Sequence, residues 1–230
     1  VLFMKAIILS AGVGSRLGNI TKTIPKPMIK IDGKPILEHN IEMCKNAGVV
    51  DILINLHHLP NVIKNYFGNG HKFGVNIYYS FEQTLLGTAG ALLSFLKQLN
   101  NEPFFVIYGD SYISFSLLDL IKFHKQKYAD FSILLTRKKS VRNSGKVVVN
   151  DSDRIMKFIE KPDVADSECH LVNAGIYFIS SYEIFEYIKP KMDFGYDVIP
   201  KILNDNYRIF GITTDAPLLT IDTPYLYNKN

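Results

Sequence analysis

Residues 5–33 read KAIILSAGVGSRLGNITKTIPKPMIKIDG, and this stretch decides the fold because a short apolar run passes directly into a long irregular loop. The run at 5–9 is typical of a strand that is buried on both faces of a sheet. Helix-breaking residues then follow at five positions, Gly12, Gly14, Gly18, Pro25 and Pro27. A loop of this length inside a compact domain is usually functional. The stretch therefore predicts a first strand followed by a functional loop.

The loop carries two cations, Arg16 and Lys26, close to its glycines. Glycines let backbone N–H groups approach an anion closely, and the guanidinium of Arg16 suits phosphate oxygens. Pro25 and Pro27 restrict the backbone on both sides of Lys26, which presets the direction of that side chain. A flexible surface loop is the alternative, but glycines and cations after a first strand favour phosphate binding.

After the loop, apolar runs that read as strands alternate with segments of helical periodicity. We expect strands at 51–56, 75–80, 104–108 and 131–136, and helices at 35–47, 60–67, from about 91, and 117–128. Such alternation indicates βαβ units and a mainly parallel sheet. Later segments change the pattern, with a hairpin at 145–160, a strand at 172–179, helices near 182–188 and 197–203, and short strands after 207. We therefore predict one α/β domain over residues 4–230, with a nucleotide-binding first half and an antiparallel insertion.

The composition is that of an ordinary globular protein, with 47% hydrophobic residues among 230. The balance of 26 basic against 22 acidic residues is too even to indicate nucleic-acid binding. Two cysteines, Cys44 and Cys169, form neither a disulfide framework nor a zinc ligand set, which favours a cytoplasmic location. No apolar run reaches the ~20 residues of a membrane span, and we expect no signal peptide. Residues 1–3 precede the first Met and are interpreted as an extension outside the domain.

Two aspartates follow apolar runs and are candidate metal ligands. Asp110 comes directly after the strand expected at 104–108, so its carboxylate should face the same crevice as the first loop. Mg²⁺ is usually held by one or two carboxylates together with substrate phosphates. The alternative for Gly109 and Asp110 is a simple turn pair. The second candidate, Asp222, precedes Thr223 and Pro224, and its alternative is the N-cap of a helix.

Seven short motifs occur in order along the chain. They are AGVGSRL at 11–17, PKPM at 25–28, LGTAGA at 86–91, GD at 109–110, EKP at 160–162, NAGI at 173–176 and DTP at 222–224. In this series the chain resembles the sugar-1-phosphate nucleotidyltransferases, or NDP-sugar pyrophosphorylases, over essentially its whole length. The most similar branch is that of the short guanylyltransferases acting on D-glycero-α-D-manno-heptose 1-phosphate. The resemblance implies a Rossmann-like three-layer sandwich with a mostly parallel central sheet.

The resemblance also implies a reaction in which an NTP and a sugar 1-phosphate give an NDP-sugar and pyrophosphate, with Mg²⁺ as the cofactor. A sugar phosphate oxygen would attack the α-phosphorus in line. The implied catalytic residues are Arg16 at the leaving pyrophosphate, Lys26 at the α-phosphate, and Asp110, which would hold Mg²⁺ together with Asp222. The implied nucleotide-binding residues are Ser10, Ala11, Gly12, Gly14, Ser15, Glu82, Gly87, Thr88 and Ala89.

Four residues match the family's sugar-phosphate pocket, namely Gly145, Glu160, Lys161 and Asn173. Lys161 would pair with the phosphate of the sugar, and Glu160 would accept hydrogen bonds from sugar hydroxyls. The alternative is an exposed ion pair at a strand end, which is common for adjacent Glu and Lys. In the base-reading segment, Glu82 would accept hydrogen bonds from guanine N1–H and N2–H, and the alternative is that it faces water.

Three functional hypotheses follow from these residues. The first is an Mg²⁺-dependent enzyme that joins GTP to a sugar 1-phosphate, heptose or mannose, as a monomer or small homo-oligomer. The second is a uridylyl-, thymidylyl- or cytidylyltransferase on the same fold. The third is a catalytically silent protein that binds NDP-sugar and regulates a partner. The presence of Arg16, Lys26, Asp110 and Asp222 together argues against the third.

Overall fold

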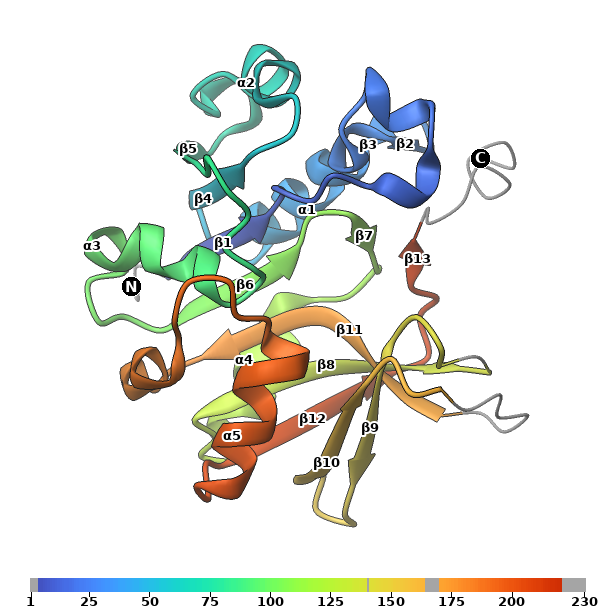
Figure 1. Ribbon diagram of the computed structural model, residues 1–230. Coiled ribbons are helices and arrows are strands. Elements are labelled where there is room, and N and C mark those ends of the chain that lie inside the picture. The colour runs from blue at the N-terminus through green and yellow to red at the C-terminus, as the bar shows by residue number, and fades with distance from the viewer. Residues whose placement is uncertain (1–3, 140, 164–169, 221–230) are drawn as a thin grey trace.

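A computed structural model describes residues 4–139, 141–163 and 170–220 of the chain (Figure 1). Within these residues, a central sheet of nine strands forms the middle layer. Its first half is parallel and runs in the order β6-β1-β4-β5. These four strands are β1 (Lys5–Leu9), β4 (Asp51–Leu56), β5 (Asn76–Phe81) and β6 (Phe104–Tyr108). Each coincides within one residue with an apolar run that the sequence predicted as a strand.

The second half of the sheet contains the antiparallel strands. Strand β11 (His170–Ile179) pairs antiparallel with β6 on one side and with β8 (Phe131–Lys138) on the other. The predicted hairpin is formed by β9 (Gly145–Val149) and β10 (Ile155–Glu160), and β12 (Ile209–Thr214) lies parallel to β8. This arrangement confirms the predicted α/β class, a parallel core with an antiparallel addition.

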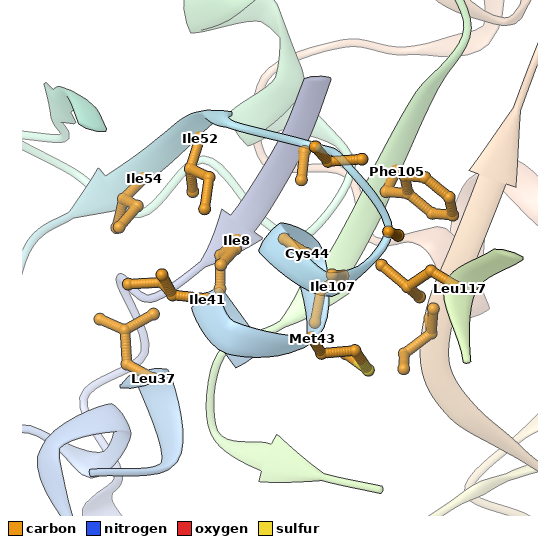
Figure 2. Packing of buried hydrophobic residues seen from close by; sticks show 14 of the residues in the cluster. Ile8, Leu37, Ile41, Met43, Cys44, Ile52, Ile54, Phe105, Ile107 and Leu117 are labelled. Atoms are coloured by element: carbon orange, nitrogen blue, oxygen red, sulfur yellow. The ribbon is translucent and has the colours of Figure 1, made fainter. Parts of the chain in front are cut away.

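Two hydrophobic clusters cover the two faces of the sheet and account for the apolar runs in the strands. In β1, Ile8 belongs to one cluster and Ile7 to the other, because successive side chains point to opposite faces. Figure 2 shows the first cluster, in which α1 (Ile36–Asn46) packs Ile41 and Cys44 against the strands. This face is also covered by α2 (Pro60–Phe67) and α4 (Leu117–Gln126), and the second face by α3 (Leu96–Leu99) and α5 (Ile199–Asn204).

The helix expected near 182–188 is a 3-10 helix at Tyr182–Tyr187, and two other expected helices begin differently from the prediction. The segment from about residue 91 starts as a 3-10 helix at Gly90–Phe95, and the segment at 197–203 is preceded by a π-helix at Phe194–Val198. Both departures arise where distant parts of the chain meet, because Met192 O accepts hydrogen bonds from Ala89 N and Gly90 N. Small strand pairs complete the fold, β2 (Lys30–Ile31) with β3 (Lys34–Pro35) and β7 (Ser111–Tyr112) with β13 (Leu219–Thr220). Among the described residues, no helix has the length and hydropathy needed to cross a bilayer.

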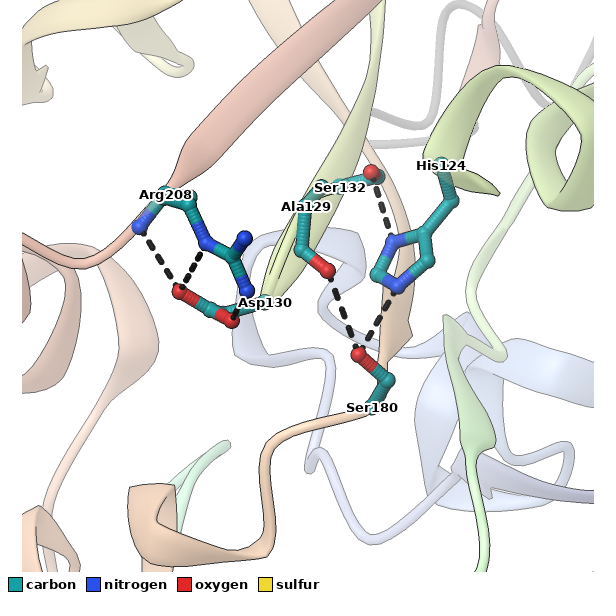
Figure 3. A network of polar contacts seen from close by, with 6 residues as sticks. All are labelled: His124, Ala129, Asp130, Ser132, Ser180 and Arg208. Atoms are coloured by element: carbon teal, nitrogen blue, oxygen red, sulfur yellow. Dashed lines mark hydrogen bonds and ion pairs between the residues drawn. The ribbon is translucent and has the colours of Figure 1, made fainter. Parts of the chain in front are cut away.

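A buried histidine joins α4 to the sheet (Figure 3). His124 is 4% exposed, and its ring nitrogens lie 2.8 Å from Ser132 Oγ and 2.9 Å from Ser180 Oγ. Because Ser180 donates its proton to Ala129 O, its oxygen accepts from Nε2–H of His124, and Nδ1 then accepts from Ser132. Burial lowers the pKa of His124 to about 4. Asp130 opposes this shift, while Arg208 and Lys125 add to it.

The buried histidine predicts a loss of stability on mild acidification. Unfolding returns the pKa of His124 from about 4 to 6.5, so the unfolded chain binds the extra proton between these values. We expect the free energy of unfolding to fall by about 2 to 3 kcal/mol as pH drops from 7 to 4.5. Urea unfolding measured across this pH range should show that His124→Gln has lost most of the pH dependence of the free energy of unfolding. His71→Gln, at an exposed position, should leave the slope of the free energy of unfolding against pH unchanged. Equal slopes in wild type, His124→Gln and His71→Gln would contradict the assignment of this pH dependence to His124.

Candidate active site

A cleft of about 710 Å³ opens at the carboxyl ends of β1, β4 and β6, where ligands of parallel α/β sheets bind. Most of the predicted site residues line it: Ser10, Ala11, Gly12, Gly14, Ser15, Arg16, Lys26, Glu82, Gly87, Thr88, Asp110, Gly145, Glu160, Lys161 and Asn173. Ala89 is fully buried behind the cleft wall, and Asp222 lies outside the described residues. The fold therefore gathers residues from both halves of the chain around one cavity.

The first loop is held in place by hydrogen bonds to its neighbours. Ser10 N donates to Asn55 Oδ1 over 2.8 Å, and His58 Nε2 lies 2.5 Å from Thr21 O. Thr21 Oγ1 donates to Gly14 O over 3.2 Å, and Gly14 has a positive φ of 65° that favours glycine. These contacts favour an ordered loop over the alternative of a flexible surface loop. Arg16 is exposed and lines the cleft.

Lys26 and Asp110 meet in the cleft. Lys26 is 9% exposed, and its Nζ lies 2.7 Å from Asp110 Oδ2. The turn at Asp110 comes close to β1, because a Cβ atom at Gly109 would lie 2.5 Å from the Ser10 hydroxyl oxygen. Asn40, itself buried, donates to Ser111 O over 3.1 Å and thus holds the far side of the turn. The expectation that Asp110 faces the first loop is confirmed.

Glu82, in the segment expected to read the base, does not face water. It is 3% exposed, and its two carboxylate oxygens accept hydrogen bonds from Asn55 Nδ2 at 2.8 Å and Leu86 N at 2.9 Å. Since Asn55 also holds Ser10, a chain of hydrogen bonds connects the first loop with the segment around Leu86. Glu82 therefore positions the wall of the cleft, and its part in base recognition stays a prediction.

The segment around Gly87 docks on a segment more than a hundred residues later in the chain. Thr88 donates to Asp193 Oδ1 from both its backbone N, at 3.0 Å, and its hydroxyl, at 2.9 Å. Phe194 N donates back to the Thr88 hydroxyl. A Cβ atom at Gly87 would lie 2.3 Å from Met192 O, so glycine is required for this approach.

The opposite end of the cleft contains the residues predicted for the sugar phosphate. Glu160 Oε1 lies 3.8 Å from Lys161 Nζ, with the carboxylate half-buried and the ammonium more exposed. Burial raises the pKa of Glu160, the charge of Asp193 raises it further, and Lys161 acts in the opposite direction. Asn173 Oδ1 accepts from Gly175 N and Nδ2 donates to a tyrosine hydroxyl, which fixes its amide orientation. The pair at 160–161 is thus part of a cavity wall.

Sequence reasoning missed several residues that line this cleft, among them Asn55, Tyr108, Asp193 and Tyr196. Asn55 interrupts the apolar part of β4 that follows Asp51, which is a usable signal for a buried hydrogen-bonding role. Asp193 and Tyr196 stand in a segment with no recognisable motif. Their place in the cleft depends on the docking of that segment against Thr88.

The residues of the cleft fit an Mg²⁺ site in which substrate oxygens would supply ligands beside the protein carboxylate. The described residues contain no cluster of three or more His, Cys, Asp or Glu side chains suited to a metal. Among the described residues, Asp110 offers a carboxylate that is 40% exposed, and it lies in the cleft beside the loop expected to hold phosphates. One carboxylate with phosphate oxygens and water is a common environment for Mg²⁺.

The chain belongs to the nucleotidyl transferase family, whose model matches residues 5–216. It is 36% identical over 228 residues to a UTP–glucose-1-phosphate uridylyltransferase from Synechocystis sp., a match covering 92% of this chain and 58% of the relative. It is 38% identical over 181 residues to the mannose-1-phosphate guanylyltransferase catalytic subunit beta of Danio rerio, covering 77% and 50%. The chain thus spans about half to three fifths of the length of these relatives. Their names confirm the resemblance that the motifs indicated.

Solved structures share the fold over nearly the whole chain. HddC from Yersinia pseudotuberculosis has a TM-score of 0.83 and 26% identity, with 98% of this chain and 97% of that chain covered. A second structure of that protein contains GMP-PN and has a TM-score of 0.82. A protein from Bacillus anthracis superposes with a TM-score of 0.86 at 23% identity, which supports the fold alone.

Proposed function

We propose that this chain transfers a nucleotidyl group from an NTP, with GTP as the first choice, to a sugar 1-phosphate of the mannose or heptose type. The products are an NDP-sugar and pyrophosphate. The observation that carries the proposal is the cleft itself, which brings Arg16, Lys26 and Asp110 together with Glu160 and Lys161 in one cavity. Two anionic substrates that must react with each other require such a shared, cation-lined cleft.

The proposed step is an in-line displacement at the α-phosphorus. An oxygen of the sugar phosphate forms the new P–O bond while the bond from the α-phosphorus to the bridging oxygen breaks. That oxygen leaves with the electron pair as part of pyrophosphate. Because the attacking phosphate is already ionised, no side chain has to remove a proton. The work of the protein is to orient two phosphates and to neutralise charge.

The residues of the first loop suit the charge that develops. Lys26 is directed by its buried stem and by Asp110, so its ammonium is preorganised for the α-phosphate. Arg16 is exposed on the same wall and can follow the departing pyrophosphate. We assign Asp110 to hold Mg²⁺ with substrate oxygens. The bound ion would supply Lewis-acid neutralisation of phosphate charge.

The choice of nucleotide has a second candidate, uridylyl transfer, because the relative from Synechocystis sp. is named a UTP–glucose-1-phosphate uridylyltransferase. Guanylyl transfer is supported by the name of the Danio rerio relative and by GMP-PN in the HddC structure. Glu82 does not favour either nucleotide, because it is buried and its two carboxylate oxygens already accept hydrogen bonds from Asn55 Nδ2 and Leu86 N.

The test is pyrophosphate release from GTP, UTP, dTTP and CTP, each with heptose, mannose and glucose 1-phosphates, in Mg²⁺ and in EDTA. We expect release that requires both substrates and Mg²⁺ and is fastest with GTP. Fastest release with UTP and glucose 1-phosphate would replace guanylyl by uridylyl transfer. NDP-sugar binding without release from any pair would favour a regulatory binding protein and refute the enzymatic proposal.

A further inference from the structure

Tyr196 is a large aromatic residue that stands in the cleft without a role in the proposed chemistry. It is 56% exposed and lines the same end of the cavity as Glu160 and Lys161. It belongs to the π-helix Phe194–Val198, a rare conformation that is often found at functional sites. In this turn Asp193 O accepts from Val198 N at 3.2 Å, which is the five-residue spacing of a π turn.

The ring of Tyr196 contacts a charged group of the site. Lys161 Nζ lies 5.4 Å from the ring centroid, within the range of a cation–π interaction. The same ammonium lies 3.8 Å from Glu160 Oε1, so the aromatic ring, the cation and the carboxylate form one group. Lys161, directly after β10, also has a positive φ of 44°, which is uncommon for a lysine.

Two glycines leave room for the carboxylate beside this ring. A Cβ atom at Gly195 would lie 2.3 Å from Glu160 Oε2, and one at Gly145 would lie 2.8 Å from the same oxygen. A side chain at either position would displace Glu160 from its place. Gly195, the residue next to Tyr196, therefore leaves the space that the Glu160 carboxylate occupies.

The group has the chemistry that a sugar phosphate needs. A carboxylate accepts hydrogen bonds from hydroxyls, an ammonium meets a phosphate, and an exposed aromatic face covers the C–H side of a sugar ring. We propose that Tyr196 is a specificity-determining residue of the sugar end, packing its ring against the sugar and holding Lys161 toward the phosphate. This inference rests on the proposed function and adds a residue to it.

The experiment separates the contribution of the sugar from that of the nucleotide by comparing each NDP with its NDP-sugar. Calorimetry on the full chain would give Kd for GDP and GDP-mannose, and for UDP and UDP-glucose. In Tyr196→Ala we expect the affinity for the NDP-sugar to fall about tenfold, and the affinity for the NDP, which keeps the phosphate facing Lys161 but has no sugar ring, to fall by much less. Tyr196→Phe should stay within about twofold of wild type, because the ring is kept. Tyr128→Ala, at an exposed tyrosine elsewhere, serves as the matched control.

Each outcome decides a different point. An unchanged NDP-sugar affinity in Tyr196→Ala, or an equal loss for NDP and NDP-sugar, would overturn the role of Tyr196 and leave the proposed function standing. Wild-type protein that binds neither NDP-sugar would overturn both. Circular dichroism of each variant would identify a loss that comes from unfolding, and in that case Tyr196→Leu, which keeps apolar volume without the ring, replaces Tyr196→Ala.

Discussion

Lys26→Met is expected to slow pyrophosphate release by about two to three orders of magnitude at saturating substrates, the usual effect of losing one preorganised donor to a transition-state oxyanion. Methionine keeps the buried stem of Lys26 and removes only its charge, so packing should survive. The lost interaction is strongest when negative charge grows on the α-phosphate. The effect should therefore appear in the single-turnover rate rather than in the Kd of the nucleotide.

The matched control for this prediction is Lys22→Met, in the same loop but exposed to solvent. It should leave the rate near that of wild type. Lys26→Arg would keep the charge but replace a point charge by a planar fork, and only partial recovery is expected. Wild-type turnover in Lys26→Met would remove Lys26 from the chemical step.

The parts of this fold that the sequence predicted are those fixed by local patterns. The strand at Lys5–Leu9 and the strand at Phe104–Tyr108 are continuous apolar runs ended by glycine or polar residues. The meeting of Lys26 and Asp110 could also be anticipated, although they lie 84 residues apart. In a parallel sheet, residues that follow neighbouring strands must reach the same edge.

The parts that the sequence did not predict depend on contacts between distant segments. Thr88 was recognised by its motif, but its partner Asp193 stands 105 residues later in a stretch without one. Burial of Glu82 depends on Asn55, and nothing local distinguishes that pair from two solvated side chains. The π turn that presents Tyr196 likewise arises at the segment docked on Thr88. Local propensity carries no information on such tertiary pairing.

Asp110→Asn is expected to lower the single-turnover rate by about a hundredfold or more and to raise the Mg²⁺ concentration needed for half of the maximal rate. The amide is nearly isosteric with the carboxylate but neutral, so it is a weak ligand for a hard cation. The turn itself should persist, because Asn40 holds it through the backbone of Ser111. Asp119→Asn, at an exposed position in the first turn of α4, is the control and should change neither quantity.

Comparison of this variant with Lys26→Met gives a sharper test of the site. The ammonium of Lys26 lies 2.7 Å from Asp110 Oδ2, so it repels any divalent cation that approaches the same carboxylate. Removing that charge should lower the Mg²⁺ requirement, whereas Asp110→Asn should raise it, although both variants turn over slowly. Mn²⁺ binding followed by electron paramagnetic resonance would report the two shifts without catalysis. Shifts in the same direction would mean that Asp110 is not the carboxylate that meets the metal.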